Sequence, residues 1–179
     1  MLIKSTSIHN ISIIKANLTD VEQLQSISKQ TFFETFAHCN TAENMQQYLE
    51  ETFNTEKLTK ELSNPHSEFY LANINKQVAG YLKINYGQAQ TELKDEHAFE
   101  IERIYVLKEF LGKQVGQTLY NQALQLAKER KVTYLWLGVW ENNARAISFY
   151  KKNGLTEFDK HIFVLGEDKQ TDILMKLEL

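Results

Sequence analysis

Apolar residues recur every three to four positions in several stretches of the chain, which is the spacing of an amphipathic helix. In the stretch that ends at Arg130, Val115, Leu119 and Ala123 would lie on one helix face. Thr19, with Glu22 three positions later, is expected to cap the first helix through a capping box. The other helices predicted in this way cover residues 19–36, 41–53, 55–62 and 143–153.

Shorter apolar runs, rich in β-branched and aromatic residues, predict strands. The run 132–140 is apolar almost throughout, as expected of a strand buried on both faces. Asn75 and Lys76 separate two such runs and suit a hairpin turn, while the polar stretch 88–97 is expected to be a loop. The predicted strands cover residues 11–17, 68–74, 77–87, 98–106, 132–140, 161–166 and 170–179.

The order of these elements predicts a mixed α/β fold with one central sheet. The strands 98–106 and 132–140 are joined through a helix, so we expect them to run parallel with a right-handed crossover. A length of 179 residues without an evident linker favours one domain spanning residues 1–179.

The composition is typical of a soluble globular protein, with 42% apolar and 24% charged residues. A net charge of −3 argues against nucleic-acid binding, which needs a concentrated basic face. The apolar runs are too short to cross a bilayer, and no signal peptide is evident. The single Cys39 has no internal disulfide partner, and its spacing to the histidines fits no metal site. We therefore expect a cytoplasmic protein with neither a metal nor a membrane partner.

Two of the seven glycines, Gly112 and Gly116, lie between the strand 98–106 and the helix that follows it. The first N–H groups of a helix have no internal partner and carry partial positive charge. Such a turn is suited to binding a phosphate, although a tight turn with close packing would explain the glycines equally well. The P-loop and Rossmann patterns are both absent.

The segment 136–155 contributes a more specific pattern. Val139, Asn143, Ala146 and Tyr150 match V-x-x-x-N-x-x-A-x-x-x-Y in register, and "IERIYV" is followed by "FLGKQVGQ". In combination these motifs resemble the GNAT family of N-acetyltransferases, and over nearly its full length the chain looks most similar to the PaiA-type spermidine/spermine acetyltransferases of bacteria. The resemblance implies a mixed central sheet with helices on both faces and a splayed parallel strand pair that binds acetyl-CoA.

The glycine turn departs from the family pattern at two positions. When the turn is aligned on Gly116, the usual Gln or Arg falls at Leu111 and the usual first glycine at Gln114. Backbone amides rather than side chains hold the phosphates, so little is lost at Leu111. Gln114 matters more if its position requires a positive φ.

The resemblance also implies acetyl transfer from acetyl-CoA to an amine by direct attack, without a metal. The CoA pyrophosphate is expected at the helix start, and the acetyl carbonyl at the end of the strand 98–106. Capping explains Asn143, and a surface position explains Lys152, as well as CoA binding does. The expected cofactor-binding residues are Ile104, Tyr105, Val106, Leu111, Gly112, Lys113, Gln114, Val115, Gly116, Gln117, Asn143, Tyr150 and Lys152.

Three side chains are candidates for proton transfer. Tyr150 is expected to protonate the departing thiolate, the alternative being a half-buried core tyrosine. An alkyl amine, with a pKa of about 10.4, must lose a proton before it attacks. Glu100 and Glu102 share one face of a strand, and either is expected to accept that proton. The alternative for these carboxylates is an ion pair with Arg103.

A polyamine acceptor would need carboxylates and aromatic faces. Phe32, Glu34 and His38 are the expected substrate-binding residues. The alternative functions are an acetyltransferase for a protein N-terminus, a lysine or another small amine, and a non-catalytic acyl-CoA-binding regulatory module. Gln114 favours the module and Tyr150 opposes it. The oligomeric state stays open, a homodimer included.

Overall fold

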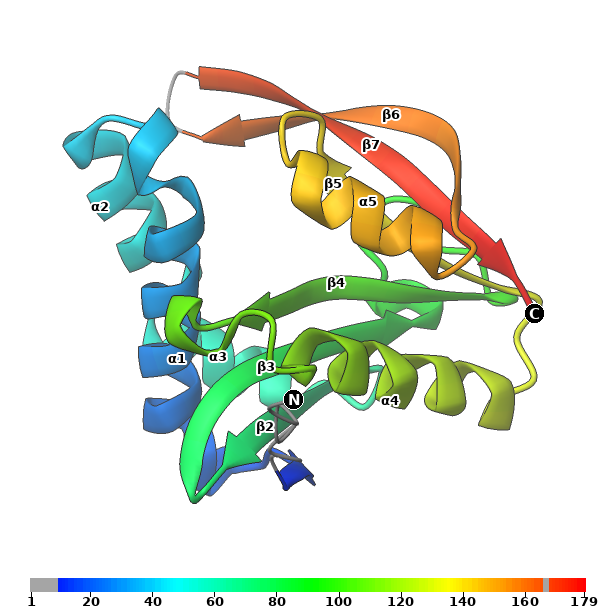
Figure 1. Cartoon of the computed structure of the whole chain (residues 1–179), viewed down its shortest axis with the longest axis horizontal. Coiled ribbons are helices and arrows are strands. Elements are labelled where there is room, and N and C mark those ends of the chain that lie inside the picture. The colour runs from blue at the N-terminus through cyan, green and yellow to red at the C-terminus, as the bar shows by residue number, and fades with distance from the viewer. Residues whose placement is uncertain (1–9, 166–167) are drawn as a thin grey trace, which may run out of the picture.

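Seven strands form one mixed sheet in the computed structural model, which describes residues 10–165 and 168–179 (Figure 1). The order across the sheet is β1-β2-β3-β4-β5-β7-β6, and β4 and β5 are the one parallel pair of neighbours among the described strands. This confirms the predicted mixed α/β fold. The strands are β1 Ile11–Lys15, β2 Ser67–Ile74, β3 Gln77–Tyr86, β4 Ala98–Val106, β5 Tyr134–Trp140, β6 Thr156–Leu165 and β7 Asp168–Glu178.

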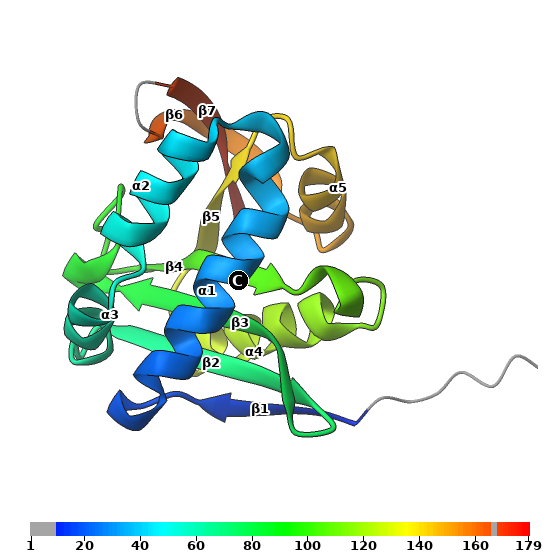
Figure 2. The ribbon, with the colours of Figure 1, turned by 90° about the vertical axis from the view of Figure 1, so that its left-hand side faces the viewer.

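Helices cover both faces of the sheet. Figure 2 shows α1 in front of the strands and α4 behind them, where α4 packs against β3 and β4. The predicted apolar face of α4, with Val115, Leu119 and Ala123, is buried in the main hydrophobic core. No helix in the described ranges is both long and apolar enough to cross a membrane. The helices are α1 Val21–Phe36, α2 Ala42–Thr52, α3 Thr55–Leu62, α4 Val115–Glu129 and α5 Ala144–Lys152.

Most predicted boundaries agree with the structure to within a few residues, but the cap of the first helix differs. Asn17, not Thr19, accepts the hydrogen bond from a backbone N–H, that of Thr19 itself, at 2.9 Å. Asp20 completes this capping box by accepting from the Asn17 N–H at 2.9 Å. The predicted box of Thr19 and Glu22 is therefore wrong, and α1 begins only at Val21. Residues 1–9 of the predicted domain and residue 166 of a predicted strand lie outside the described residues.

The parallel strands β4 and β5 pair only at their beginnings. Their register covers residues 98–100 of β4 and 134–136 of β5, and the strands then diverge. β4 stays paired with β3 as far as Val106, while β5 stays paired with β7 as far as Trp140. The sheet therefore opens between its two halves, and backbone groups on the facing edge of β4 have no partner strand there.

A β-bulge lies in β4 beside this opening. Lys83 of β3 pairs with Arg103, but the next residue, Ile84, pairs with Ile101, so Glu102 is the extra residue. A bulge re-aims the side chains that follow it. As a result Arg103 lies on the same face as Glu102, where it contacts Glu61 of α3.

Candidate active site

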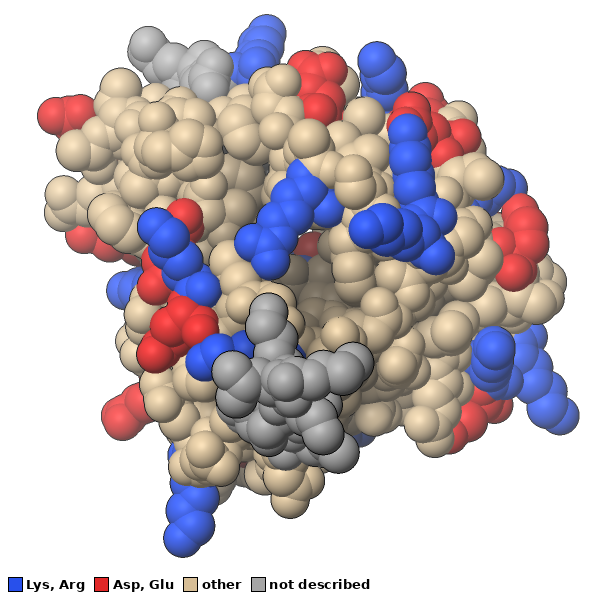
Figure 3. Space-filling view, in the orientation of Figure 1, with Lys and Arg blue, Asp and Glu red and all other residues tan. Residues whose placement is uncertain are grey.

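A cavity of about 770 Å³ occupies the opening between β4 and β5. Its walls come from α1 and α2 on one side of the sheet and from the beginning of α4 and from α5 on the other. On the face seen in Figure 3, the surface is hollowed near its centre, and Lys and Arg side chains flank the hollow. A cavity of this volume is large enough for a cofactor-sized ligand.

The glycine turn forms one end of this cavity. Gln114 directly precedes α4 with a φ of 68°, and Gly112 has a φ of 81°. The sequence position that departs from the family pattern thus does adopt the left-handed conformation that favours glycine. The N–H groups of 115–117, in the first turn of α4, have no acceptor within the helix. That turn carries no acidic residue, so it can bind an anion.

Most residues predicted to bind the cofactor line the cavity. Lys113 and Lys152 do not: Lys113 places its Nζ 4.8 Å from the centre of the Phe110 ring, and Lys152 is exposed. The predicted cofactor-binding residues that line the cavity are Ile104, Tyr105, Val106, Leu111, Gly112, Gln114, Val115, Gly116, Gln117, Asn143 and Tyr150.

The helix α5 and its cap contribute three further side chains to the cavity wall. Asn143 caps α5, because its Oδ1 accepts from the Ala146 N–H at 3.1 Å. Tyr150 is only 7% exposed, burial raises the pKa of its hydroxyl, and no described residue hydrogen-bonds to that hydroxyl. Arg145, which the sequence analysis missed, lines the cavity from the first turn of α5. The helix dipole disfavours a cation at a helix N-terminus. An arginine in the first turn of a predicted helix was therefore the signal, available in the sequence, that an anion binds there.

Glu100 lies deep in the cavity wall and is 2% exposed. Its carboxylate accepts from Asn85 Nδ2 at 2.9 Å, from the Thr91 N–H at 2.9 Å and from the Thr91 hydroxyl. Burial raises the pKa of Glu100 to about 7, and the negative charge of Glu102 acts in the same direction. Glu100 can therefore gain and lose a proton near neutral pH.

Glu102 has cations on both sides. Lys83 Nζ lies 2.5 Å and Arg103 2.9 Å from its carboxylate oxygens, and Asn85 Nδ2 donates to it at 2.6 Å. Burial alone would raise the pKa of Glu102, but Arg103 and Lys83 outweigh burial and lower it to about 2. Glu61 contacts the same two cations at 3.0 and 3.1 Å, which completes a network of two carboxylates and two cations.

Aromatic side chains dominate the wall on the α1 side. Phe32 stacks on Tyr48 with 4.5 Å between ring centres, and Phe36 meets the rings of Tyr105 at 6.4 Å and Trp140 at 5.9 Å. All five residues line the cavity. Aromatic faces of this kind suit an aliphatic or cationic ligand.

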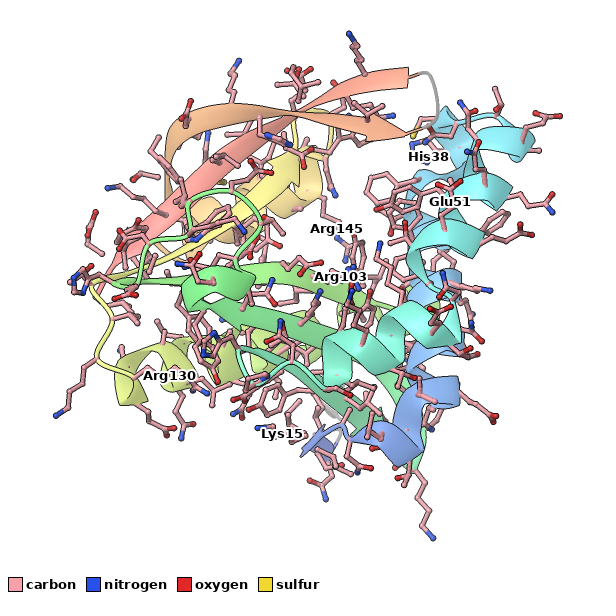
Figure 4. The ribbon with its side chains drawn as sticks, turned by 180° about the vertical axis from the view of Figure 1, so that it is seen from behind. Lys15, His38, Glu51, Arg103, Arg130 and Arg145 are labelled. Atoms are coloured by element: carbon pink, nitrogen blue, oxygen red, sulfur yellow. The ribbon has the colours of Figure 1, made fainter. Side chains whose placement is uncertain are left out.

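The other two predicted substrate residues differ in their positions. Glu34 lines the cavity, but its carboxylate already accepts from the Lys108 N–H at 2.7 Å and from Gln30 Nε2 at 3.0 Å. His38 is not part of the cavity wall and lies past the end of α1, near the end of β6 (Figure 4). Arg103 and Arg145 lie near the middle of the same view.

Comparisons with known proteins agree with this architecture. The family model described as Acetyltransferase (GNAT) family matches residues 21–155. An uncharacterized N-acetyltransferase "in pepI 3'region" of Lactobacillus delbrueckii subsp. lactis is 42% identical over 169 residues, which cover 94% of this chain and 98% of that protein.

Two further comparisons concern proteins of Thermoplasma acidophilum. Its spermidine N(1)-acetyltransferase is 26% identical over 149 residues, which cover 81% of this chain and 88% of that protein. The crystal structure of a PaiA N-acetyltransferase in complex with coenzyme A has a TM-score of 0.79 and 24% identity, covering 95% of this chain and 99% of that one.

Proposed function

The chain belongs to the GNAT family of acetyl-CoA-dependent N-acetyltransferases, and we propose that its acceptor is a primary amine of a polyamine such as spermidine or spermine. One observation carries the proposal: a single cavity joins a helix start suited to an anion to an aromatic and acidic wall. The helix start suits the phosphates of CoA, and the aromatic and acidic wall suits an aliphatic cation. The similarity to a spermidine acetyltransferase supports the same acceptor class.

The α4 turn and the open edge of β4 would hold the cosubstrate. N–H groups of 115–117 would bind the pyrophosphate, and Arg145, which lines the same cavity, would supply a positive charge to the cosubstrate. Backbone groups of Ile104, Tyr105 and Val106 line the cavity where β4 has lost its neighbour β5. Unpaired backbone groups are available to the pantetheine amides and to the acetyl carbonyl.

Glu100 is the better of the two candidate bases. An amine with a pKa of about 10.4 binds as an ammonium ion and must give up a proton before its nitrogen attacks the carbonyl carbon. Glu100 accepts this proton, directly or through one water, because its pKa of about 7 lies near the working pH. Glu102 is a poor acceptor, because Lys83 and Arg103 stabilise its ionised form.

Tyr150 would act on the other product. As the C–S bond breaks, the sulfur takes the bonding electrons and needs a proton. The Tyr150 hydroxyl stays protonated across the neutral range because burial raises its pKa, and Tyr150 lines the cavity. It donates its proton to the thiolate and recovers one from solvent afterwards.

A thiol-release assay tests the proposal. Acetyl-CoA is mixed with the purified protein and, in separate reactions, spermidine, spermine, free lysine, an aminoglycoside and a peptide with a free N-terminal alanine. We expect the highest kcat/KM with a polyamine. A preference for the peptide, lysine or aminoglycoside would replace the polyamine with that acceptor. Tight CoA binding by calorimetry without turnover on any amine would instead indicate a non-catalytic acyl-CoA-binding module.

A further inference from the structure

A row of three side chains crosses the half of the sheet that lies beyond the opening. Asp172 of β7 is the register partner of Trp140 on β5 and of His161 on β6. Register partners in antiparallel strands place their side chains on the same face. All three residues line the cavity, so the row forms part of its wall.

Asp172 is the acidic group of this wall that has no direct partner. Its neighbour His161 pairs with Glu92, with 3.2 Å between Nε2 and Oε1. The Asp172 carboxylate forms no hydrogen bond and no ion pair with any residue in the described ranges, which include both cavity-lining arginines, Arg103 and Arg145. Burial raises the pKa of Asp172 to about 6, with His161 opposing and Glu92 adding to that effect. A half-buried carboxylate without a partner is unfavourable, and a bound cation would satisfy it.

The space beside this carboxylate is open because position 138 is a glycine. A Cβ at Gly138 would lie 3.5 Å from Asp172 Oδ2, so a larger side chain would crowd the carboxylate. Trp140, on the same strand face two residues later, borders this space, and the Phe36 ring lies 5.9 Å from its ring centre. A carboxylate next to an indole ring in one cavity wall is a combination that can bind an ammonium group.

Asp172 lies further along the sheet than Glu100, the proposed base. Glu100 pairs with Trp136, whereas Asp172 pairs with Trp140, four residues further along the strand. At roughly 3.3 Å per residue the component along β5 is about 13 Å, and the two strand spacings of about 4.8 Å across β5 bring the separation to roughly 16 Å. An extended polyamine can span such a distance, whereas a monoamine has no second charge to place there.

We infer that Asp172, beside Trp140 and Gly138, binds the second ammonium group of the acceptor and selects long diamines over monoamines. This inference rests on the proposed function. Asp172 is thus a specificity-determining residue, and the carboxylate contacts substrate without taking part in the proton transfers at Glu100 and Tyr150.

Matched amines test the inference. Steady-state kinetics compare 1,8-diaminooctane with octylamine, which share a carbon chain and differ in one ammonium group. For the unmodified enzyme we expect a lower KM for the diamine. Asp172→Asn should raise that KM roughly tenfold or more, as expected for the loss of a charge-assisted contact, and leave the octylamine KM within about twofold.

Three controls make the result decisive. Asp159→Asn removes a carboxylate of β6 that does not line the cavity, and it should leave both KM values unchanged. Asp172→Glu keeps the charge and should retain part of the diamine preference. Thermal melts with and without 1,8-diaminooctane give a readout independent of turnover, and the diamine-induced shift in Tm should disappear in Asp172→Asn.

The outcomes separate the two proposals. Equal KM values for diamine and monoamine, or equal effects of Asp172→Asn on both, would overturn the role of Asp172 while the acetyltransferase assignment to amines stands. If the unmodified enzyme acetylates no amine at all, the polyamine proposal fails, and the inference about Asp172 fails with it.

Discussion

The carboxylates of Glu100 and Glu102 face the same side of β4, yet their surroundings favour opposite protonation states. Burial raises the pKa of Glu100 to about 7, whereas Arg103 and Lys83 outweigh burial and lower that of Glu102 to about 2. Asn85 Nδ2 donates to both carboxylates, at 2.9 and 2.6 Å, so the two groups are close enough to influence each other. Two neighbouring acids with separated pKa values suit different roles.

Glu100→Gln should remove the proton acceptor. Below pH 7 the carboxyl of the unmodified enzyme is protonated and cannot accept a proton, so kcat/KM for the amine should rise as pH increases through about 7. In Glu100→Gln this acidic limb should vanish, and kcat/KM at pH 8 should fall roughly 10²–10⁴-fold. The measurement is a pH–rate profile from pH 5.5 to 9. Glu96→Gln, an exposed carboxylate outside the cavity, is the control, and a limb that persists in Glu100→Gln would assign it to another group.

Glu102→Gln should shift the acidic limb of the pH–rate profile rather than abolish it. Removing this negative charge takes away one of the causes that raise the pKa of Glu100, so the limb should shift to lower pH while turnover continues. The variant also leaves Lys83 and Arg103 with one carboxylate fewer, and its free energy of unfolding should fall by up to about 3 kcal/mol.

Glu61→Gln is the matched control for this experiment. It weakens the ion pairs to the same two cations, but Glu61 is not among the main causes of the shift in the pKa of Glu100. Denaturant unfolding at pH 7 should therefore show a loss of stability in both variants, and the pH–rate profile should move only in Glu102→Gln. An equal movement in both would mean that ion-pair geometry, rather than the charge of Glu102, sets the limb.

The sequence predicted those parts of the fold and site that are encoded by contiguous patterns. The strand 98–106, the glycine turn and α4 follow one another, so local periodicity and the family motif located this half of the cavity. The bulge at Glu102 depends on register with β3, which no local pattern contains. Asp172 and Trp140 are likewise neighbours only because β7 pairs with β5. The register of that pairing is not contained in the local pattern of either strand.

Gln114→Gly should stabilise the protein. Gln114 has a φ of 68°, and a left-handed conformation costs an L-residue other than glycine about 1–2 kcal/mol. Glycine removes this cost but gains chain entropy in the unfolded state, so we expect the free energy of unfolding to rise by up to about 1 kcal/mol. CoA affinity, measured by calorimetry, should stay equal or become tighter because the backbone amides keep their positions.

Gln125→Gly provides the opposite expectation on the same helix. Gln125 is exposed in the middle of α4, where glycine lowers stability by roughly 0.5–1 kcal/mol. Denaturant unfolding should thus give effects of opposite sign for the two glycine substitutions. A destabilised Gln114→Gly, or one that binds CoA more weakly, would show that the Gln114 side chain itself contributes to the site.

Tyr150→Phe tests the proton donor. The ring keeps its packing, and no described residue loses a hydrogen bond, so folding and the KM for acetyl-CoA should change little. The departing thiolate loses its acid, and kcat should fall roughly 10²–10⁴-fold. A thioester of a more acidic thiol needs less protonation as it leaves, and it should therefore restore the variant more than the unmodified enzyme.

Tyr120→Phe is the control, because the Tyr120 hydroxyl is also buried without a hydrogen bond to the described residues but lies outside the cavity wall. It should keep full turnover, which separates loss of a buried hydroxyl from loss of an acid at the site. Presteady-state measurements without a burst of free thiol would establish that chemistry limits kcat. If Tyr150→Phe then turns over as fast as Tyr120→Phe, Tyr150 is a packing residue and the thiolate takes its proton from water or another group.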